Sequence, residues 1–521
     1  MRDGNDRLSS SPERVVSKPR PPVWPAWLLA LAWGVLPALP ALLAGDLLGH
    51  PYTDLYPSVW GLWVAAESWP GVVTQTAQLA APDGMGFYYS SPVKGWLAGI
   101  LVPFLGVPVT WNLLTVAARV VTVGLFGHAA RAWGLRGPGI LVVAAAVGCS
   151  AVFQGYAVEG IVEGTDGWPL ALWAWAAGHK RWGWSAVGLA LCVVSSWYLG
   201  AVACLLVVFA ALRDKKALVG LLGVVLAAPA LGAFLSAFSG GRALDPAVRA
   251  AMGAVLSPQV PGAFQDGLQP FAISTYTGVL LSLAALGARS RVLLLALIPA
   301  VLSVGAGPWY ALPVLSSLRF PYRWHLATLA VMALCAGGLA DQLRSRWSYL
   351  LGVLIAAETL LLARVEPVLP GAPAVVPELY AAVDQTVLDV PGPVSLPPGE
   401  INPSRPRSRW FLYAQTLHGQ PTPWVPDFNS VGTTSAVHPE HKAVLDAFAA
   451  YDRVVQPEPT PLPADTIQRM QALGIGWIVV HHRIYGLTQE IGLRDVLVKQ
   501  GAELVARDDD RWLLRIPAAV P

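Results

Sequence analysis

The sequence predicts a mainly α-helical, polytopic membrane bundle of about eleven spans, followed by a small extracytoplasmic α/β domain at the C-terminal end. Two observations predict this class. The chain is 55% hydrophobic and only 13% charged, whereas an ordinary soluble protein carries about a quarter charged residues. The polar residues are also unevenly placed, because residues 26–364 consist mostly of apolar runs and residues 365–521 read like a soluble protein.

Each predicted span is an apolar run near the length of about twenty residues that crosses a bilayer as a helix, or shorter where helices are buried in a bundle. The first run follows a polar tail, 1–25, and is too long for the apolar core of a signal peptide, so we expect a retained anchor. The predicted spans are 26–45, 109–131, 138–156, 167–179, 183–197, 199–212, 217–237, 273–288, 291–306, 322–342 and 347–363.

Basic residues predict the direction of the bundle, because Lys and Arg gather in the cytoplasmic loops of membrane proteins. With these spans, every basic loop lies on the side of the N-terminal tail. The first outer loop, 46–108, the later outer segments and the domain 365–521 are then periplasmic or extracellular, and the membrane is the inner (plasma) membrane. The basic loops hold Arg131, Arg136, Lys180, Arg181, Arg213, Lys215, Lys216, Arg289, Arg291, Arg344 and Arg346.

The first outer loop is long enough to hold structure of its own. Residues 57–69 and 92–107 both look helical, and turn residues at 81–86 separate them. If 93–107 crossed the bilayer, every later basic loop would face outward. We therefore expect this segment to be a half-buried or re-entrant helix.

The C-terminal domain shows alternating helix and strand patterns. Helices are expected at 443–454, 464–473 and 488–500, a buried strand at 476–481, and a hairpin from 503–506 and 511–516. No nucleotide-binding fingerprint follows any of these strands.

Acidic residues of two outer loops are the first candidates for chemistry. Carboxylates at the mouth of an apolar bundle are costly to bury unless they are paired, bind a cation or take part in a reaction. One acid from each loop would supply a general base together with a metal ligand or a second acid. Solvated loop acids are the alternative. The candidates are Asp54, Glu159, Glu163 and Asp166, with Asp46, His50 and Tyr56 as secondary residues.

Arg319 and Arg323 form a second candidate group, with His325 close behind them. Both arginines fall on the outer side, against the charge bias of the loops. A bound anion such as the phosphate of a lipid-linked donor would explain them, because the guanidinium fork matches phosphate geometry. Snorkelling to outer-leaflet headgroups or pairing with loop acids is the alternative.

Other site classes find no support in the sequence. A net charge of +3 without a basic stripe does not favour a nucleic-acid partner. The four cysteines lie in apolar runs without CxxC spacing, which supports neither a disulfide framework nor a zinc site. No nucleophile-elbow motif is present.

The layout resembles the GT-C superfamily, the multispan glycosyltransferases that use polyprenyl-phosphate-linked sugars. One span precedes a long outer loop that begins with Asp54 and holds two helices, a later outer loop carries more acids, and a soluble domain closes the chain. The stretches 54–60, 82–84, 312–323 and 473–481 also look like bacterial members of this group, most of all uncharacterised ones.

The resemblance implies a role for several candidates. Asp54 would match the first-loop acid that acts as base on the acceptor or helps to bind metal, and Glu159, Glu163 or Asp166 would supply the second-loop acid. Arg319 or Arg323 would face the phosphate of a polyprenyl-phosphate sugar, and the acceptor would be a glycan, lipid or protein of the cell envelope. Family members often have Asp-Glu where this chain has Asp54-Leu55. That departure leaves catalysis and the cofactor open, with a divalent cation, Mg²⁺ or Mn²⁺, as the candidate.

Two other functions remain open. A flippase or transporter of a lipid-linked saccharide should place ionisable residues near mid-span and often has repeated halves. The absence of an internal repeat and the low charge of the spans disfavour it. A non-catalytic envelope-assembly protein would leave the loop acids without a chemical role.

Overall fold

The structure is a computed structural model that describes the greater part of the chain. The N-terminal tail up to residue 21, much of two later outer loops, and Arg319 lie outside the described residues. Those residues are 22–51, 54–237, 276–303, 321–362, 367–390, 410–424, 439–451, 461–481 and 487–518.

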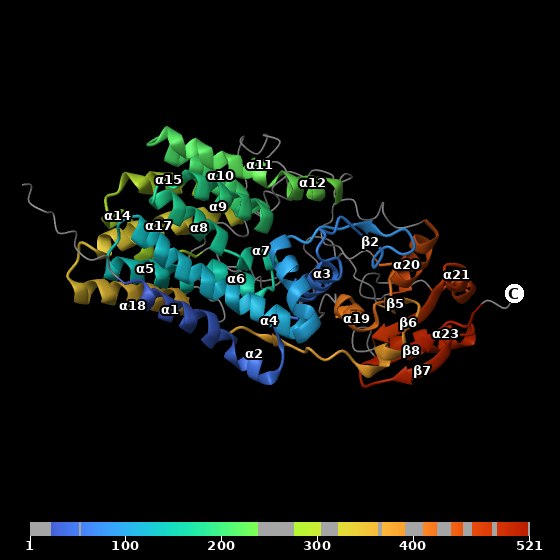
Figure 1. The fold of residues 1–521 in the computed structure, drawn as a ribbon. Coiled ribbons are helices and arrows are strands. Elements are labelled where there is room, and N and C mark those ends of the chain that lie inside the picture. Colours follow the sequence, from blue (N-terminus) through green and yellow to red (C-terminus); the bar gives the residue numbers. More distant parts are fainter. Residues whose placement is uncertain are drawn as a thin grey trace, which may run out of the picture.

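Helices occupy the predicted spans, because an apolar run can cross or line a membrane only when its backbone hydrogen bonds are satisfied within the segment. They form an elongated bundle that occupies one end of the molecule (Figure 1). The bundle helices are α1 (Trp24–Val35), α2 (Leu39–Ala44), α4 (Pro92–Ala132), α5 (Gly137–Gly148), α6 (Ala151–Val158), α8 (Trp168–Gly178), α9 (Trp182–Ser195), α10 (Trp197–Ala211), α11 (Leu222–Leu226), α12 (Ala228–Ala237), α14 (Val279–Gly287), α15 (Leu294–Ser303), α17 (His325–Ala340) and α18 (Ser345–Leu362), with 3-10 turns η1 (Leu36–Ala38), η2 (Lys215–Leu221), η3 (Arg291–Leu293) and η5 (Pro321–Trp324).

Several of these helices are too short or too bent to count as spans by length. Within the described residues, four segments are long and apolar enough to cross a membrane: Trp24–Ala44, Pro92–Ala132, Gly137–Val158 and Ser345–Leu362. A bent pair, Lys215–Leu226 with Ala228–Ser236, would be a fifth. The chain is thus a multi-pass membrane protein, but the count of about eleven crossings is not confirmed and stays a prediction.

A kink divides α4 near the predicted boundary between the segment 93–107 and the span 109–131. Gly106 has a φ of +73° and a ψ of +167°, a backbone conformation that suits glycine, and Pro103 and Pro108 flank it. Before the kink, large apolar side chains such as Trp96 and Phe104 are exposed. The half-buried or re-entrant placement of residues 93–107 stays a prediction.

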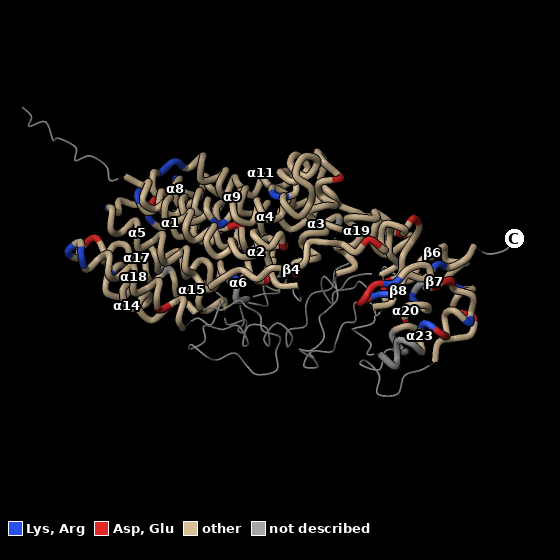
Figure 2. Tube along the Cα trace, turned by 90° about the horizontal axis from the view of Figure 1, so that it is seen from below, with Lys and Arg blue, Asp and Glu red and all other residues tan. Residues whose placement is uncertain are grey.

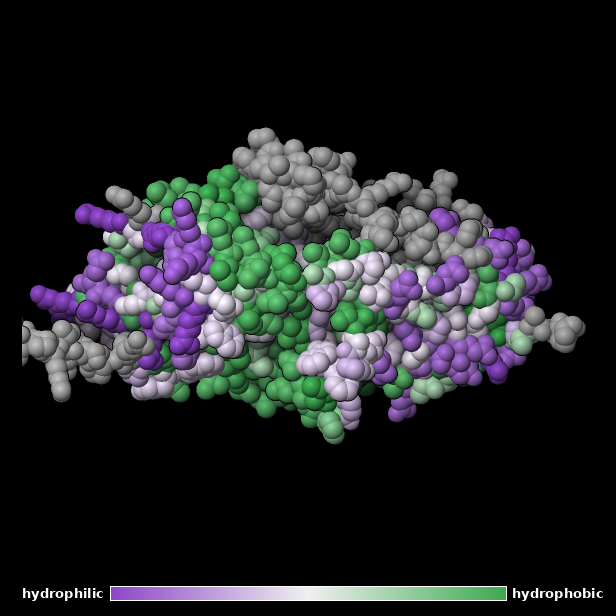
Figure 3. All heavy atoms as spheres, turned by 45° about the horizontal axis from the view of Figure 1, so that its top comes forward, coloured by the Kyte–Doolittle hydropathy of each residue, from purple (hydrophilic) through white to green (hydrophobic). Residues whose placement is uncertain are grey.

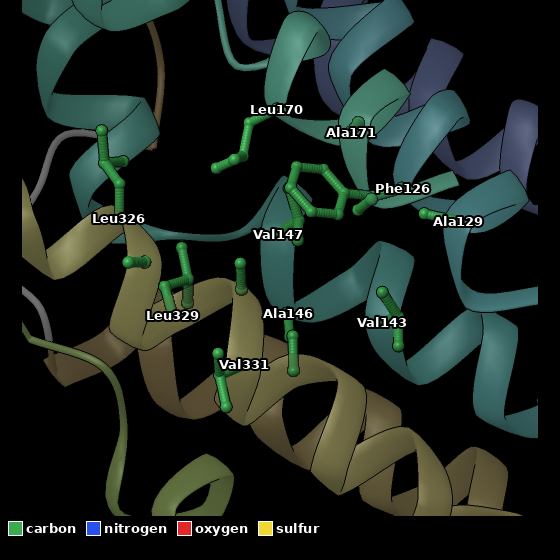
Figure 4. Packing of buried hydrophobic residues seen from close by; sticks show 14 of the residues in the cluster. Phe126, Ala129, Val143, Ala146, Val147, Leu170, Ala171, Leu326, Leu329 and Val331 are labelled. Atoms are coloured by element: carbon green, nitrogen blue, oxygen red, sulfur yellow. The ribbon is translucent and has the colours of Figure 1, made fainter. Parts of the chain in front are cut away.

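Small residues allow the bundle helices to approach closely. At the crossing of α5 and α17, a Cβ added to Gly139 would lie 2.6 Å from the Gly337 carbonyl oxygen. Around this crossing the core consists of alanine and branched aliphatic side chains with Phe126 among them, as the close-up of Figure 4 shows.

The outer surface of the bundle has the character expected of a lipid-facing wall. Apolar side chains cover much of it, and hydrophilic residues gather toward both ends of the molecule (Figure 3). Lys and Arg gather in loops at the end of the bundle that lies away from the C-terminal sheet (Figure 2). That gathering agrees with the predicted shared side of the basic loops.

The C-terminal region is built on a four-stranded sheet of order β5-β6-β8-β7. β5 and β6 are parallel, whereas β6–β8 and β7–β8 are antiparallel. All seven residues of β6 are buried, as expected for a strand with neighbours on both sides and helices over its faces. The elements are η6 (Glu378–Ala382), β5 (Thr386–Val390), α19 (Trp410–His418), α20 (Pro439–Tyr451), α21 (Thr466–Ala472), β6 (Ile475–His481), α23 (Leu487–Lys499), β7 (Glu503–Arg507) and β8 (Arg511–Arg515).

The first outer loop lies between the bundle and this sheet (Figure 1). Its helix α3 (Leu55–Glu67) packs on α19, and Tyr56 stacks on Tyr413 with ring centroids 5.6 Å apart. One hydrophobic core is shared by α3 and the C-terminal strands and helices. The loop's other elements are β1 (Leu47–Leu48), β2 (Gln75–Thr76) and β3 (Met85–Gly86), and β1 pairs with β4 (Gly371–Ala372).

Backbone hydrogen bonds reinforce this contact. The Thr422 N–H donates to the Gln78 carbonyl at 3.0 Å, and the Ala80 N–H donates to the Trp424 carbonyl at 3.2 Å. The C-terminal region is therefore held against the first outer loop by main-chain pairing as well as by apolar packing.

Candidate functional site

The two acidic outer loops meet through their backbones. The His50 N–H donates to the Val158 carbonyl at 2.7 Å. Gly160 has a φ of +65°, and a Cβ added there would lie 2.6 Å from the Cα of Leu55. Only glycine fits such an approach. Asp54 directly precedes Leu55 and Glu159 directly precedes Gly160, so the structure brings the two candidate acids into one neighbourhood.

Asp54 occupies the N-terminal end of α3. It is half-buried, and its backbone carbonyl accepts from the Ser58 N–H at 3.0 Å. Its carboxylate makes no capping hydrogen bond to the first turn of α3. Tyr52 and Thr53, immediately before it, lie outside the described residues.

Glu159 follows α6 directly, and only 1% of its surface is exposed. A buried carboxylate in a membrane bundle is costly unless its surroundings compensate for it. Glu159 is therefore a stronger functional candidate than a solvated loop acid would be.

Arg323 comes from the 3-10 turn η5, far away in the sequence, and is 5% exposed. Its guanidinium lies over the rings of Tyr156 and Tyr198, 5.8 Å and 4.6 Å from their centroids. Tyr156 precedes Glu159 by one helical turn of α6. Tyrosine faces stabilise a cation where water is scarce. The end of α6 therefore provides a binding face for the arginine one turn before the candidate acid.

Asp166 has a different environment. Its Oδ1 lies 3.1 Å from the Lys94 ammonium, and its Oδ2 accepts from the Ser91 hydroxyl at 2.6 Å. Lys94 also donates to Thr165 Oγ1 at 2.5 Å. Both charged side chains are almost fully buried. This carboxylate is thus neutralised by the start of α4 and joins that helix to the second outer loop at α7 (Val162–Thr165).

Sequence reasoning missed Lys94 and a second buried cation, Arg119 of α4, which is 8% exposed. The signal was present in each case as a lone basic residue inside an apolar run. Averaged hydropathy hides such residues, although the cost of burying a charge marks them for attention.

The remaining candidates have varied placements. Asp46 is half-buried beside β1, and its backbone carbonyl accepts from the Asn112 amide at 2.8 Å. His50 is half-buried and tied to the second loop by its backbone bond to Val158. His325 begins α17 and is 2% exposed, two residues after Arg323. Glu163 lies in α7 with its side chain outside the described residues, and Arg319 lies outside them altogether.

The described part of the chain contains no cluster of side chains that is arranged to bind a metal ion. There, no three His, Cys, Asp or Glu side chains are grouped so that they could hold one ion.

Comparisons with known proteins decide the fold. No family model matches the chain, and no curated protein matches it. Among solved structures, the mycobacterial arabinofuranosyltransferase AftD superposes with a TM-score of 0.57 at 16% identity, covering 95% of this chain. The fold is GT-C. The resemblance to the GT-C superfamily is thereby confirmed as a likeness of fold.

Two further structures have the same kind of match at lower scores. ArnT from Cupriavidus metallidurans in the apo state gives a TM-score of 0.49 at 14% identity over 96% of this chain and 97% of its own. The Archaeoglobus fulgidus oligosaccharyltransferase, in complex with Zn and sulfate, gives 0.46 at 12% identity over 88% and 67%. At these scores they add nothing to the assignment. The chain spans 41% of the length of AftD, and the shared fold does not assign the activity of any of these enzymes to this chain.

Proposed function

We propose that this GT-C chain is a membrane glycosyltransferase that transfers a sugar from a polyprenyl-phosphate donor to a cell-envelope acceptor on the outer face of the inner (plasma) membrane. The observation that supports it most is the meeting of the two acidic loops, Asp54–Leu55 against Glu159–Gly160. Arg323 adds a cation over Tyr156, one turn away on α6. The basic loops lie at the opposite end of the bundle (Figure 2), which supports an outward-facing site.

The proposed reaction is a displacement at the anomeric carbon with inversion. Asp54 takes the proton from the acceptor's hydroxyl, and the acceptor oxygen forms a bond to that carbon. The bond from the anomeric carbon to the phosphate oxygen breaks, and polyprenyl phosphate leaves with the electron pair. Arg323 stabilises the negative charge on the departing phosphate. Glu159 holds and orients the acceptor beside Asp54.

The test is transfer from a panel of radiolabelled polyprenyl-phosphate sugars to envelope lipid and glycan acceptors by the purified protein in nanodiscs. Asp54→Asn is expected to lower the transfer rate about 10²- to 10⁴-fold, the usual contribution of a general base. The matched control is Asp83→Asn, which alters an exposed aspartate of the same outer loop and should leave transfer unchanged.

The possible outcomes test the role of Asp54 and the enzymatic activity separately. Equal transfer by wild type and Asp54→Asn would remove Asp54 as the base. Absence of transfer from every donor would overturn the enzyme and favour a flippase.

A flippase for a lipid-linked saccharide is the second candidate function, and Arg119 is the observation in its favour. It is an ionisable residue buried within the predicted span 109–131, a feature of transport pathways. Movement of a fluorescent lipid-linked saccharide across proteoliposomes would test it. Wild-type movement that Arg119→Gln abolishes, without any transfer activity, would establish this function instead.

A further inference from the structure

A small cavity lies inside the bundle, on the side of the second outer loop. Its volume is about 20 Å³, which is room for one water-sized particle. Its wall includes Trp33 from α1, Arg119 and Thr122 from α4, and Thr165 from α7. Helices that are far apart in the sequence therefore meet at this cavity, and its wall contains one charged side chain and several polar ones.

Arg119 brings a positive charge to this cavity. Its Nη2 donates to the Trp33 carbonyl at 2.9 Å and to Gln154 Oε1 at 2.7 Å. Both of these partners are neutral. Arg119 makes no ion pair with any described residue, and its buried Nε has no acceptor among them. An uncompensated charge in the interior of a membrane bundle is costly by several kcal/mol, so its retention calls for a negative partner.

A second donor lines the same cavity. The indole N–H of Trp33 is buried and has no acceptor within the described part of the chain. The hydroxyls of Thr122 and Thr165 already donate to the carbonyls of Ala118 and Val162, at 2.7 Å and 3.0 Å. Arg119 and Trp33 both line the cavity, and each has a buried N–H group without an acceptor among the described residues. A buried donor left unsatisfied costs about 1–3 kcal/mol, so an acceptor bound in the cavity would stabilise the bundle.

The charge of Arg119 is not balanced within the wall of the cavity. Lys94, which donates to Thr165, is balanced by Asp166. Arg119 is the one charged residue among those that line the cavity, and no ion pair between it and a described residue balances its charge.

We propose that this cavity binds a single monatomic anion, chloride under cellular conditions, held by the Arg119 Nε–H and the Trp33 Nε1–H. A halide accepts from both donors and also neutralises the guanidinium, whereas a water molecule would supply only the acceptor. The space of about 20 Å³ favours a monatomic anion over a phosphate, a carboxylate ligand or a sugar. Asp54, Glu159 and Arg323 are not among the residues that line the cavity.

The bound anion fixes the position of helices that carry the candidate site. Arg119 joins the carbonyl of Trp33 in α1 to Gln154 in α6, and Glu159 directly follows α6. The anion therefore stabilises the fold and, if the proposed function holds, also supports transfer by keeping Glu159 in place. The binding itself does not depend on that function.

The primary test measures thermal unfolding of the full chain in detergent while chloride or bromide replaces gluconate at constant ionic strength. Wild type should melt at a rising temperature with a saturable dependence on halide, because a ligand that binds only the folded state stabilises it. Arg119→Met should lose this dependence. The matched control is Arg213→Met, an exposed arginine after α10, which should keep it.

Trp33→Phe provides a variant that keeps the charge and removes one donor. It should weaken the apparent halide affinity without abolishing the effect, so the proposal remains testable if Arg119→Met fails to fold. Anomalous scattering from crystals grown in bromide should place one peak beside Arg119. A halide effect equal in wild type, Arg119→Met and Trp33→Phe, or a water and no bromide peak at this position, would overturn the proposal.

Discussion

Glu159 and Asp166 belong to the same outer loop and are equally buried, each with 1% of its surface exposed, but their surroundings differ. Asp166 lies 3.1 Å from the Lys94 ammonium and accepts from Ser91. Glu159 lies where the backbones of two loops touch and where Arg323 packs on the preceding turn of α6. Burial alone therefore does not separate a structural carboxylate from a candidate for chemistry, whereas the ion pair with Lys94 assigns Asp166 a structural role.

The difference predicts opposite responses to substitution. Removing a partner of Asp166 should lower the stability of the fold. Changes where the loops meet should lower transfer more than they lower stability. Variants on each side of this division test it, from the largest expected effect to the smallest.

Lys94→Met should have the largest effect on stability. It leaves the Asp166 carboxylate buried without its counter-ion, and breaking a buried pair from one side costs about 3–5 kcal/mol. Unfolding of the detergent-solubilised protein, followed by tryptophan fluorescence in denaturant, would measure the loss. Adding Asp166→Asn to the same chain should recover part of it, since no charge is then stranded.

An exposed ion pair provides the matched control for Lys94. Lys442 and Asp446 lie one turn apart on α20, with side chains 47% and 62% exposed. Lys442→Met should change the free energy of unfolding by only about 0.5 kcal/mol. Equal stability of Lys94→Met and Lys442→Met would show that the buried pair does not hold α4 to the second outer loop.

Gly160→Ala should have an intermediate effect and should break the contact between the two acidic loops. The new Cβ would lie 2.6 Å from the Cα of Leu55, and the φ of +65° disfavours alanine. Such strain costs about 1–3 kcal/mol. Under the proposed function, the displaced Asp54 should also reduce transfer to a greater extent than the loss of stability explains.

Gly474→Ala is the control that distinguishes the steric contact between Gly160 and Leu55 from the cost of a left-handed backbone. Gly474 has a φ of +71°, but a Cβ there would meet nothing within 4 Å. It should therefore carry only the left-handed backbone cost, about 1 kcal/mol, and leave transfer intact. If both glycine variants transferred sugar equally well, the close approach of the two loops would not matter for the reaction.

The sequence predicted where most helices lie, but it did not predict where most of them begin, end or break. Apolar composition identifies the run 138–156 but not its division into α5 and α6 at Cys149 and Ser150, because hydropathy measures how apolar a segment is and not the path of its backbone. The strand 476–481 and the hairpin of 503–506 and 511–516 were predicted close to β6, β7 and β8. The order β5-β6-β8-β7 was not, since it depends on pairing between distant segments.

For the candidate site, the sequence identified the candidate residues, and only the structure showed which of them lie close to one another. Loop positions indicated Asp54 and Glu159, but their proximity depends on Gly160 fitting against Leu55. Nothing in the local sequence distinguished Asp166 from Glu159, because its partner Lys94 comes from another segment. The roles of these residues remain predictions that the loop and glycine variants test.

His418, in the C-terminal region, shows a third way to bury an ionisable group, and its effect should be the smallest. It stacks on Tyr380, and its Nδ1 accepts from the Gln420 N–H at 3.0 Å. Burial lowers the pKa of His418 to about 4, while the nearby Asp389 carboxylate opposes this shift. Unlike Asp166, this side chain stays neutral instead of gaining a counter-charge.

The sign of the pH effect follows from that lowered pKa. Between the unfolded value of about 6.5 and the folded value of about 4, the unfolded chain binds more protons. The His418 contribution is therefore complete above pH 6.5 and is lost as the pH falls toward 4. His418→Gln, which keeps an acceptor for Gln420, should flatten the fall in stability across this window, measured by denaturant unfolding at a series of pH values. His179→Gln, at an exposed position, should leave the profile unchanged. A profile for His418→Gln as steep as that of wild type would mean that the pKa of His418 is not lowered in the folded chain.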